Sequence, residues 1–146
     1  MNPGRLLGVD YGNVRIGLAV CDSDWRIATP LEQYTRRNSV LDAEFFVKLL
    51  AREEVFAAVV GIPMDTDGGE NNGTSLCRAF GEWLKATTGL DVFYFDERCT
   101  TVAAEEMLWA AGLRHKERKA RRDKIAATLI LQAFIDNARE VLDDGL

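Results

Sequence analysis

The chain opens with three short segments in which apolar and polar residues alternate, a pattern typical of half-buried β-strands. The first runs from Arg5 to Tyr11, the turn dipeptide Gly12-Asn13 follows it, and the second runs from Arg15 to Asp22. A third covers Arg26 to Pro30 and is expected to run on towards Tyr34. Because neighbouring strands joined by short turns pair antiparallel, we predict an antiparallel meander at the N-terminus.

The apolar positions then change to helical spacing. Ser39 followed by Asp42 resembles a capping box and predicts the start of a helix. The apolar residues that continue this helix at the required spacing are Leu41, Phe45, Phe46, Leu49 and Leu50. The continuous apolar run from Phe56 to Gly61 predicts a strand buried on both faces. A second helix is predicted from about Thr74 to Thr88, with Gly89 as its stop.

The last part of the chain adds one strand and two helices. The strand is Val92 to Phe95, and the helices run from about Thr101 to Ala111 and from about Asp123 to Leu142. Hairpin strands followed by βα units predict an α/β fold. We expect a mixed five-stranded sheet, with three antiparallel N-terminal strands, two parallel strands after them, and helices on both faces. With no repeat or linker, residues 1–146 predict a single domain.

Composition narrows the class of protein. The 146 residues are 47% hydrophobic and 28% charged, as in an ordinary globular domain. The longest apolar stretch, Phe56 to Ile62, is far shorter than the roughly 20 residues of a membrane helix. Three cysteines without a C-x-x-C pair argue against a disulfide framework or zinc knuckle and favour a reducing cytoplasm. His115 is the only histidine, which leaves carboxylates as the chemical groups to consider.

Charge is unevenly distributed along the chain. The formal net charge is −5, yet the segment from Arg114 to Lys124 carries seven basic side chains against two acidic ones. The basic residues of this segment are Arg114, Lys116, Arg118, Lys119, Arg121, Arg122 and Lys124. A local positive field of this kind is suited to a polyanion such as nucleic acid, although a solvated charged loop would have the same composition.

Carboxylates stand at the ends or starts of three predicted elements. Asp10 ends the first strand, Asp96 and Glu97 follow the strand at Val92 to Phe95, and Asp123 opens the last helix. Neighbouring strand residues point to opposite faces, so one of Asp96 and Glu97 is expected at a site and the other in a structural role. Asp10 is equally suited to a turn, and Asp123 to a helix N-cap.

Carboxylates gathered without basic partners repel one another and attract a cation. Oxygen ligands favour Mg²⁺ or Mn²⁺, and such an ion can activate water for attack on phosphorus. Together with the basic segment, this chemistry predicts hydrolysis of a phosphodiester in DNA or RNA.

Four motifs stand in order along the chain. Residues 10–22 read DYGNVRIGLAVCD, and residues 59–63 read VVGIP and are followed by Asp67-Gly68. Residues 96–101 read DERCTT, and residues 123–132 read DKIAATLILQ. These motifs resemble those of the YqgF (RuvX-like) family, which are D-x-G-x-[KR]-R-I-G-x-A-x-S-D, V-x-G-[LI]-P…D-G, D-E-R-x-[ST]-T and D-x-x-A-A-x-x-I-L-Q. Val14 and Cys21 depart from the pattern, at positions that are not proposed ligands.

This resemblance implies a ribonuclease H-like fold and similarity to Holliday-junction resolvases and to nucleases that mature the 5′ end of pre-16S rRNA. It implies Asp10, Glu97 and Asp123 as the catalytic, metal-binding triad for Mg²⁺ or Mn²⁺. Arg15 and Arg98 become candidates for phosphate contact, beside the seven residues of the basic segment. For Arg98, an ion pair with a neighbouring carboxylate is the equal alternative.

The expectation is therefore a metal-dependent nuclease acting on precursor rRNA or on branched DNA, cytoplasmic, without a membrane partner, and a monomer or weak homodimer. The alternative is a non-catalytic nucleic-acid-binding module of the same fold. A phosphotransferase that uses the same D-x-G turn is a weaker third choice, because no second phosphate-binding glycine motif follows. Backbone contacts by Lys and Arg do not separate RNA from DNA.

Overall fold

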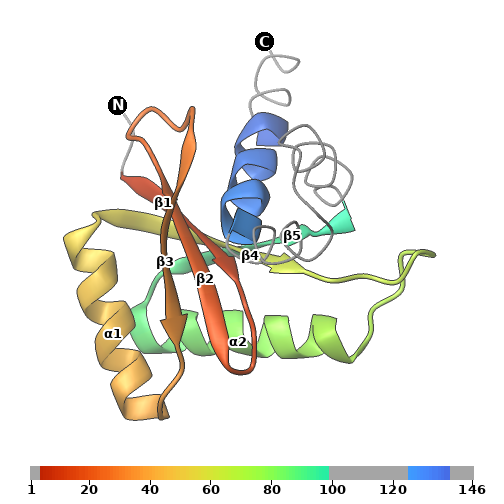
Figure 1. The fold of residues 1–146 in the computed structure, drawn as a ribbon, viewed down its shortest axis with the longest axis horizontal. Coiled ribbons are helices and arrows are strands. Elements are labelled where there is room, and N and C mark those ends of the chain that lie inside the picture. The colour runs from red at the N-terminus through yellow and green to blue at the C-terminus, as the bar shows by residue number, and fades with distance from the viewer. Residues whose placement is uncertain (1–3, 99–124, 139–146) are drawn as a thin grey trace, which may run out of the picture.

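A computed structural model describes residues 4–98 and 125–138 of the chain. Five strands within them form one mixed sheet in the order β3-β2-β1-β4-β5 (Figure 1). Strands β1 to β3 pair antiparallel, whereas β4 pairs parallel with both β1 and β5, as predicted. The strands are β1 (Arg5–Asp10), β2 (Arg15–Cys21), β3 (Ala28–Thr35), β4 (Val55–Ile62) and β5 (Asp91–Asp96).

Helices cover both faces of the sheet, which also confirms the prediction. Helices α1 (Ser39–Arg52) and α2 (Asn72–Thr88) lie on one face, and a helix over residues 125–138 lies on the other (Figure 1). The predicted helix from Thr101 to Ala111 lies outside the described residues, as do both ends of the helix predicted from Asp123 to Leu142. None of the helices in the described ranges is long and apolar enough to cross a membrane.

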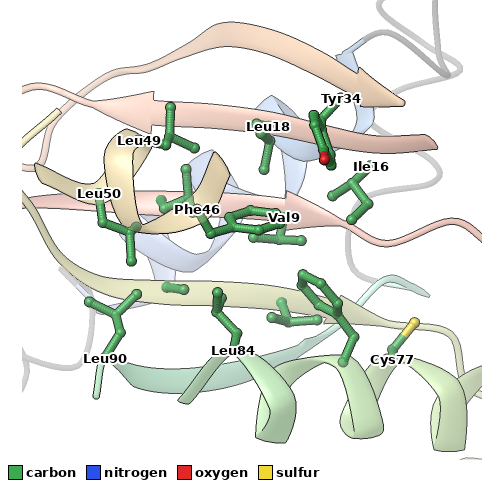
Figure 2. Packing of buried hydrophobic residues seen from close by; sticks show 14 of the residues in the cluster. Val9, Ile16, Leu18, Tyr34, Phe46, Leu49, Leu50, Cys77, Leu84 and Leu90 are labelled. Carbon is green, nitrogen blue, oxygen red and sulfur yellow. The ribbon is translucent and has the colours of Figure 1, made fainter. Parts of the chain in front are cut away.

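Each face of the sheet has its own core, because successive strand residues point to opposite sides. In β1, Leu7 and Val9 join the core under α1 and α2, while Leu6 joins the core under the 125–138 helix. Figure 2 shows the first core, with Phe46 and Leu84 from the two helices packed on the strands. The alternation that predicted β1 therefore also decides which of its residues reach each helix layer.

The start of α1 differs in detail from the prediction. The helix begins at Ser39 as expected, but Asn38 is its N-cap, and the Asn38 side chain accepts a hydrogen bond from Leu41 N. Asp42 does not act as the capping-box partner of Ser39. It is 3% exposed and accepts hydrogen bonds from Tyr34 Oη at 2.5 Å and from Arg37 N at 2.9 Å. The capping-box interpretation was wrong because these two partners, which precede the helix, hold the carboxylate inward.

Helix α2 begins two residues before the predicted Thr74. Asn71 is its N-cap and forms a capping box with Thr74: each side chain accepts a hydrogen bond from the backbone N–H of the other residue. At the far end Gly89 adopts φ = 76°, the left-handed conformation in which a helix commonly stops. The expected stop at Gly89 is thus confirmed.

The 125–138 helix is tied to the β2–β3 hairpin by one side chain. Gln132 accepts a hydrogen bond from Ala28 N at 2.8 Å and donates one to Arg26 O at 3.0 Å. The apolar side chains of Ala127, Ile130 and Leu131 also pack on the sheet. This fixes the position of the helix above β1, which matters for the site described next.

Candidate active site

A pocket of about 200 Å³ opens where β1 and β5 end and α2 begins. Two of the predicted site residues, Asp10 and Glu97, line the same pocket although 87 positions separate them in sequence. Its full lining is Asp10, Tyr11, Gly12, Asn13, Pro63, Gly73, Leu76, Cys77 and Glu97. The sheet topology therefore brings together two of the three carboxylates expected from the sequence.

Asp10 reaches the pocket as the last residue of β1. Its partner across the β1–β2 ladder is Gly17, and a Cβ at Gly17 would lie 3.6 Å from the Asp10 Cβ. The chain then turns sharply into β2. A Cβ at Gly12 would lie 2.4 Å from the carbonyl oxygen of Arg15, so the turn has no room for a larger residue. This accounts physically for the D-x-G spacing.

Glu97 follows β5 directly and is placed by the sheet. Its N–H donates to Ile62 O at 2.9 Å, which extends the β4–β5 pairing by one residue. Its side chain lies against Gly61, where a Cβ would come within 2.9 Å of Glu97 Oε1. Burial raises the pKa of Glu97 to about 7, and the negative charges of Asp10 and then Asp96 contribute to the increase.

Asp96 has a different role from its neighbour. Its carboxylate accepts hydrogen bonds from Arg98 Nε and Nη2, the latter at 2.5 Å, and this side-chain pairing lowers the pKa of Asp96. Of the two adjacent acids, Glu97 lines the pocket and Asp96 forms an ion pair, as strand geometry requires of neighbouring residues.

Arg98 also binds the loop between β4 and α2. Its Nη1 donates to the carbonyl oxygens of Asp65 and Thr66, at 3.1 and 3.3 Å. The ion pair that was one of the two alternatives for Arg98 is therefore present. Its contact with phosphate stays a prediction. In this arrangement Arg98 links the end of β5 to the loop and thereby supports the backbone on either side of Glu97.

The pocket walls include residues that the sequence did not single out as functional. Cys77 comes from α2, and Tyr11 and Asn13 come from the β1–β2 turn. Burial, with the charges of Glu97 and Asp10, raises the pKa of Cys77 to about 11. The D-x-G spacing could have pointed to Tyr11, since it lies between Asp10 and Gly12. Cys77 carries no comparable signal, because only the packing of α2 brings it there.

The remaining predicted site residues are distributed as follows. Arg15 is exposed at the first residue of β2. Asp123 and the basic residues from Arg114 to Lys124 lie outside the described residues. Within residues 4–98 and 125–138, no three His, Cys, Asp or Glu side chains form a group that could hold a metal ion. Asp10 and Glu97 are the part of the expected triad that the described chain contains.

The fold identifies the structural class. The chain resembles a solved structure of T. thermophilus RuvC in complex with a Holliday junction substrate, with a TM-score of 0.56 and 15% identity. The match covers 92% of this chain and 96% of that one. A second Thermus thermophilus RuvC structure gives a TM-score of 0.50 at 15% identity, over 88% and 91% of the two chains. The fold is therefore ribonuclease H-like, as expected.

Sequence comparison identifies the family. A family model described as "RuvX: Holliday junction resolvase" matches residues 4–137, and the chain belongs to this family. A Rhodopirellula baltica relative named "Putative pre-16S rRNA nuclease" is 45% identical over 93% of this chain and 79% of its own length. An Anaplasma marginale relative of the same name is 42% identical over 92% of this chain and 86% of its own length. The chain is thus a nuclease, a hydrolase of phosphodiester bonds in nucleic acid.

Proposed function

We propose that the chain cleaves phosphodiester bonds with a divalent cation at the Asp10–Glu97 pocket, and that a precursor of ribosomal RNA is its substrate. The observation that carries the proposal is the convergence of two carboxylates, from the ends of β1 and β5, on one pocket. Proximity to Asp10 contributes to the raised pKa of Glu97, and a bound cation would relieve that repulsion.

The side chains of the pocket fit a hard cation. The two carboxylates offer oxygen ligands, which Mg²⁺ and Mn²⁺ prefer. Burial raises the pKa of Cys77 to about 11, so its thiol is protonated at neutral pH when no metal is bound. Asp10 and Glu97 would hold the ion, which supplies positive charge to the phosphodiester and lowers the pKa of water.

Asp123 is proposed as the third ligand. It precedes Ala127 by four positions, the spacing of one face of a helix. Ala127 belongs to the described 125–138 helix, and a Cβ at Gly17 would lie 3.8 Å from the Ala127 Cβ and 3.6 Å from that of Asp10. The helix face that carries Ala127 is therefore next to Asp10, which supports a role for Asp123 in the same site.

The basic residues of the chain would hold the substrate. Arg15, exposed beside the pocket end of the sheet, and the segment from Arg114 to Lys124 are proposed to contact backbone phosphates. We expect the protein to act in the cytoplasm as a monomer or weak homodimer.

The names of the relatives favour RNA, whereas the family description favours branched DNA. The direct test incubates the purified protein with a 5′-extended 16S rRNA precursor and with a four-way DNA junction, each with Mg²⁺, Mn²⁺ or EDTA. We expect a metal-dependent cut in the RNA. Cleavage of the junction alone would assign the site to resolution. Tight binding with no product from either substrate would favour the non-catalytic module.

The raised pKa of Glu97 gives a second test, without substrate. Because the pKa of this carboxyl is near 7 in the folded protein and about 4.5 when unfolded, the folded state holds the proton more tightly. Stability of the metal-free protein should therefore fall as the pH rises from about 4.5 through 7. Glu97→Gln has no carboxyl group to ionise at this position, so it does not lose stability in this way. In EDTA, the Tm of the variant minus the Tm of the wild type should therefore increase between pH 5 and pH 8.

Addition of Mg²⁺ at pH 8 should raise the Tm of the wild type and not that of Glu97→Gln, because the cation binds the folded carboxylates. Glu44→Gln, which alters an exposed residue of α1, is the control for removal of one charge. A Tm difference between Glu97→Gln and wild type that does not change with pH would contradict the assigned environment of Glu97.

A further inference from the structure

Three arginines gather at one end of the β2–β3 hairpin, and we call them the arginine cluster: Arg15, Arg36 and Arg37. Arg15 pairs with Thr35 across the two strands, and Arg36 N donates to Val14 O at 2.8 Å. The cluster is therefore held at the end of the hairpin that adjoins the β1–β2 turn. The opposite end, near residues 22–27, carries Arg26.

Arg36 connects the cluster to the pocket. Its Nη1 donates to Tyr11 Oη at 2.5 Å, and its guanidinium carbon lies 5.2 Å from the centre of the Tyr11 ring. Tyr11 lines the pocket next to Asp10, and its ring packs on Phe80 of α2 at 4.8 Å between centroids. The Arg36 guanidinium therefore contacts a residue of the pocket wall, and both the hydrogen bond and the cation–π contact with Tyr11 hold it there.

Within the described residues, the three positive charges of the cluster are set against one contacting carboxylate, that of Asp42. Asp42 Oδ2 lies 3.6 Å from Arg36 Nε, and Asp42 Oδ1 accepts from Tyr34 Oη, which in turn accepts from Arg37 Nε at 3.1 Å. The buried Asp42 carboxylate thus interacts with Arg36 directly and with Arg37 through the Tyr34 hydroxyl. The Arg36 side chain remains 33% exposed, and Arg15 and Arg37 are exposed. A surplus of cationic hydrogen-bond donors faces solvent beside the pocket.

We propose that the arginine cluster binds the phosphate backbone of the substrate strand immediately beside the cleavage pocket. The proposal rests on the proposed function only for the ligand, a polynucleotide. Guanidinium groups match phosphate oxygens geometrically, and contacts with Tyr11 and Asp42 already restrict Arg36, so less side-chain freedom is lost on binding. The cluster is distinct in sequence from the basic segment Arg114 to Lys124, and it would place one flank of the bound strand next to Asp10.

The test measures binding in EDTA, so that cleavage does not contribute. The probe is a short fluorescein-labelled single-stranded RNA, titrated by anisotropy from about 50 to 200 mM salt. The main variant is the double change Arg15→Gln with Arg37→Gln. Arg36→Gln is measured beside it, with thermal unfolding of each variant, because loss of the Tyr11 and Asp42 contacts can also destabilise the fold. Arg26→Gln removes one positive charge, half the change of the double variant, at the opposite end of the hairpin and is the control for loss of charge.

If the double variant loses two phosphate contacts, its affinity at about 0.15 M salt should fall roughly tenfold, and the negative slope of log K against log salt should become shallower by about 1.4. Arg26→Gln should leave both near the wild-type values. The proposal is overturned if the double variant binds like wild type, or if Arg26→Gln weakens binding by as much per charge removed, which would indicate only the loss of net charge.

The two proposals fail in different ways. If the double variant binds like wild type and the wild type cleaves with metal, the proposal for the arginine cluster is wrong and the proposed nuclease site stands. If the double variant binds more weakly and the wild type does not cleave with any metal, the proposal for the arginine cluster stands and the proposed reaction is wrong.

Discussion

Replacement of Asp10 with asparagine should reduce cleavage by about a thousandfold or more, while the protein remains folded. Asparagine has nearly the same shape as aspartate but no charge, so it weakens the hold on a divalent cation. Such a cation contributes several kcal/mol to the transition state, and each 1.4 kcal/mol corresponds to a factor of about ten. Initial rates on the cleaved substrate with Mg²⁺ measure the loss, and thermal unfolding in EDTA checks the fold.

Asp91→Asn is the matched control for that variant. Asp91 is exposed at the first residue of β5, and Glu97 follows the last residue of the same strand. Removal of one negative charge there should leave the rate unchanged. RNA binding by Asp10→Asn in EDTA should also be retained or slightly stronger, since one carboxylate near the phosphates has been neutralised. Cleavage by Asp10→Asn at the wild-type rate would refute the assignment of the site.

Gly8→Ala should destabilise the fold strongly, because β1 and the 125–138 helix are in close contact at this position. A Cβ at Gly8 would lie 2.7 Å from the carbonyl oxygen of Ala127 and 2.7 Å from the Cβ of Leu131. Neither atom is the flexible end of a side chain, so the helix would have to move away from β1. Overpacking of this kind costs about 1–3 kcal/mol. For a chain of this length, that corresponds to a fall in Tm of roughly 3–10 °C.

Gly17→Ala offers a close comparison on the neighbouring strand. A Cβ there would meet the Asp10 and Ala127 Cβ atoms at 3.6 and 3.8 Å, which is ordinary contact. Because alanine also restricts the unfolded chain, this change should leave the stability unchanged or raise it by up to about 1 kcal/mol. Thermal and urea unfolding of both variants measure the contrast. Equal stability of the two would show that the helix packs less closely on β1 than these distances require.

Local periodicity was sufficient to predict the order of the elements within the described residues and the position of Asp10. Alternation places Leu7 and Val9 on one face of β1, which ends at Asp10 beside the Gly12 turn. Strand geometry also predicted that Asp96 and Glu97 would separate. Which of the two lines the pocket depends on Arg98 and on the carbonyl groups of a loop 33 positions away. The resemblance to the family, rather than periodicity, pointed to Glu97.

Features that depend on contacts between elements could not be predicted in this way. The sequence pattern of Ser39 and Asp42 fits a capping box, yet Tyr34 and Arg37 hold Asp42 instead. Cys77 becomes a wall of the pocket through the packing of α2 on the sheet. The arginine cluster requires the β2–β3 register, which pairs Arg15 with Thr35. The assignment of Asp123 stays a prediction.

The hydrogen bond from Glu97 N to Ile62 O makes the position of the Glu97 side chain depend on the length of β5. Insertion or deletion of one residue inside Asp91–Asp96 would exchange the inward and outward positions at the end of the strand. The Glu97 carboxylate, which lines the same pocket as Asp10, would then face away from it, although every proposed site residue would still be present in the chain. Spacing therefore constrains this protein as strictly as residue identity, and length variation among its relatives should fall in the loops rather than inside β5.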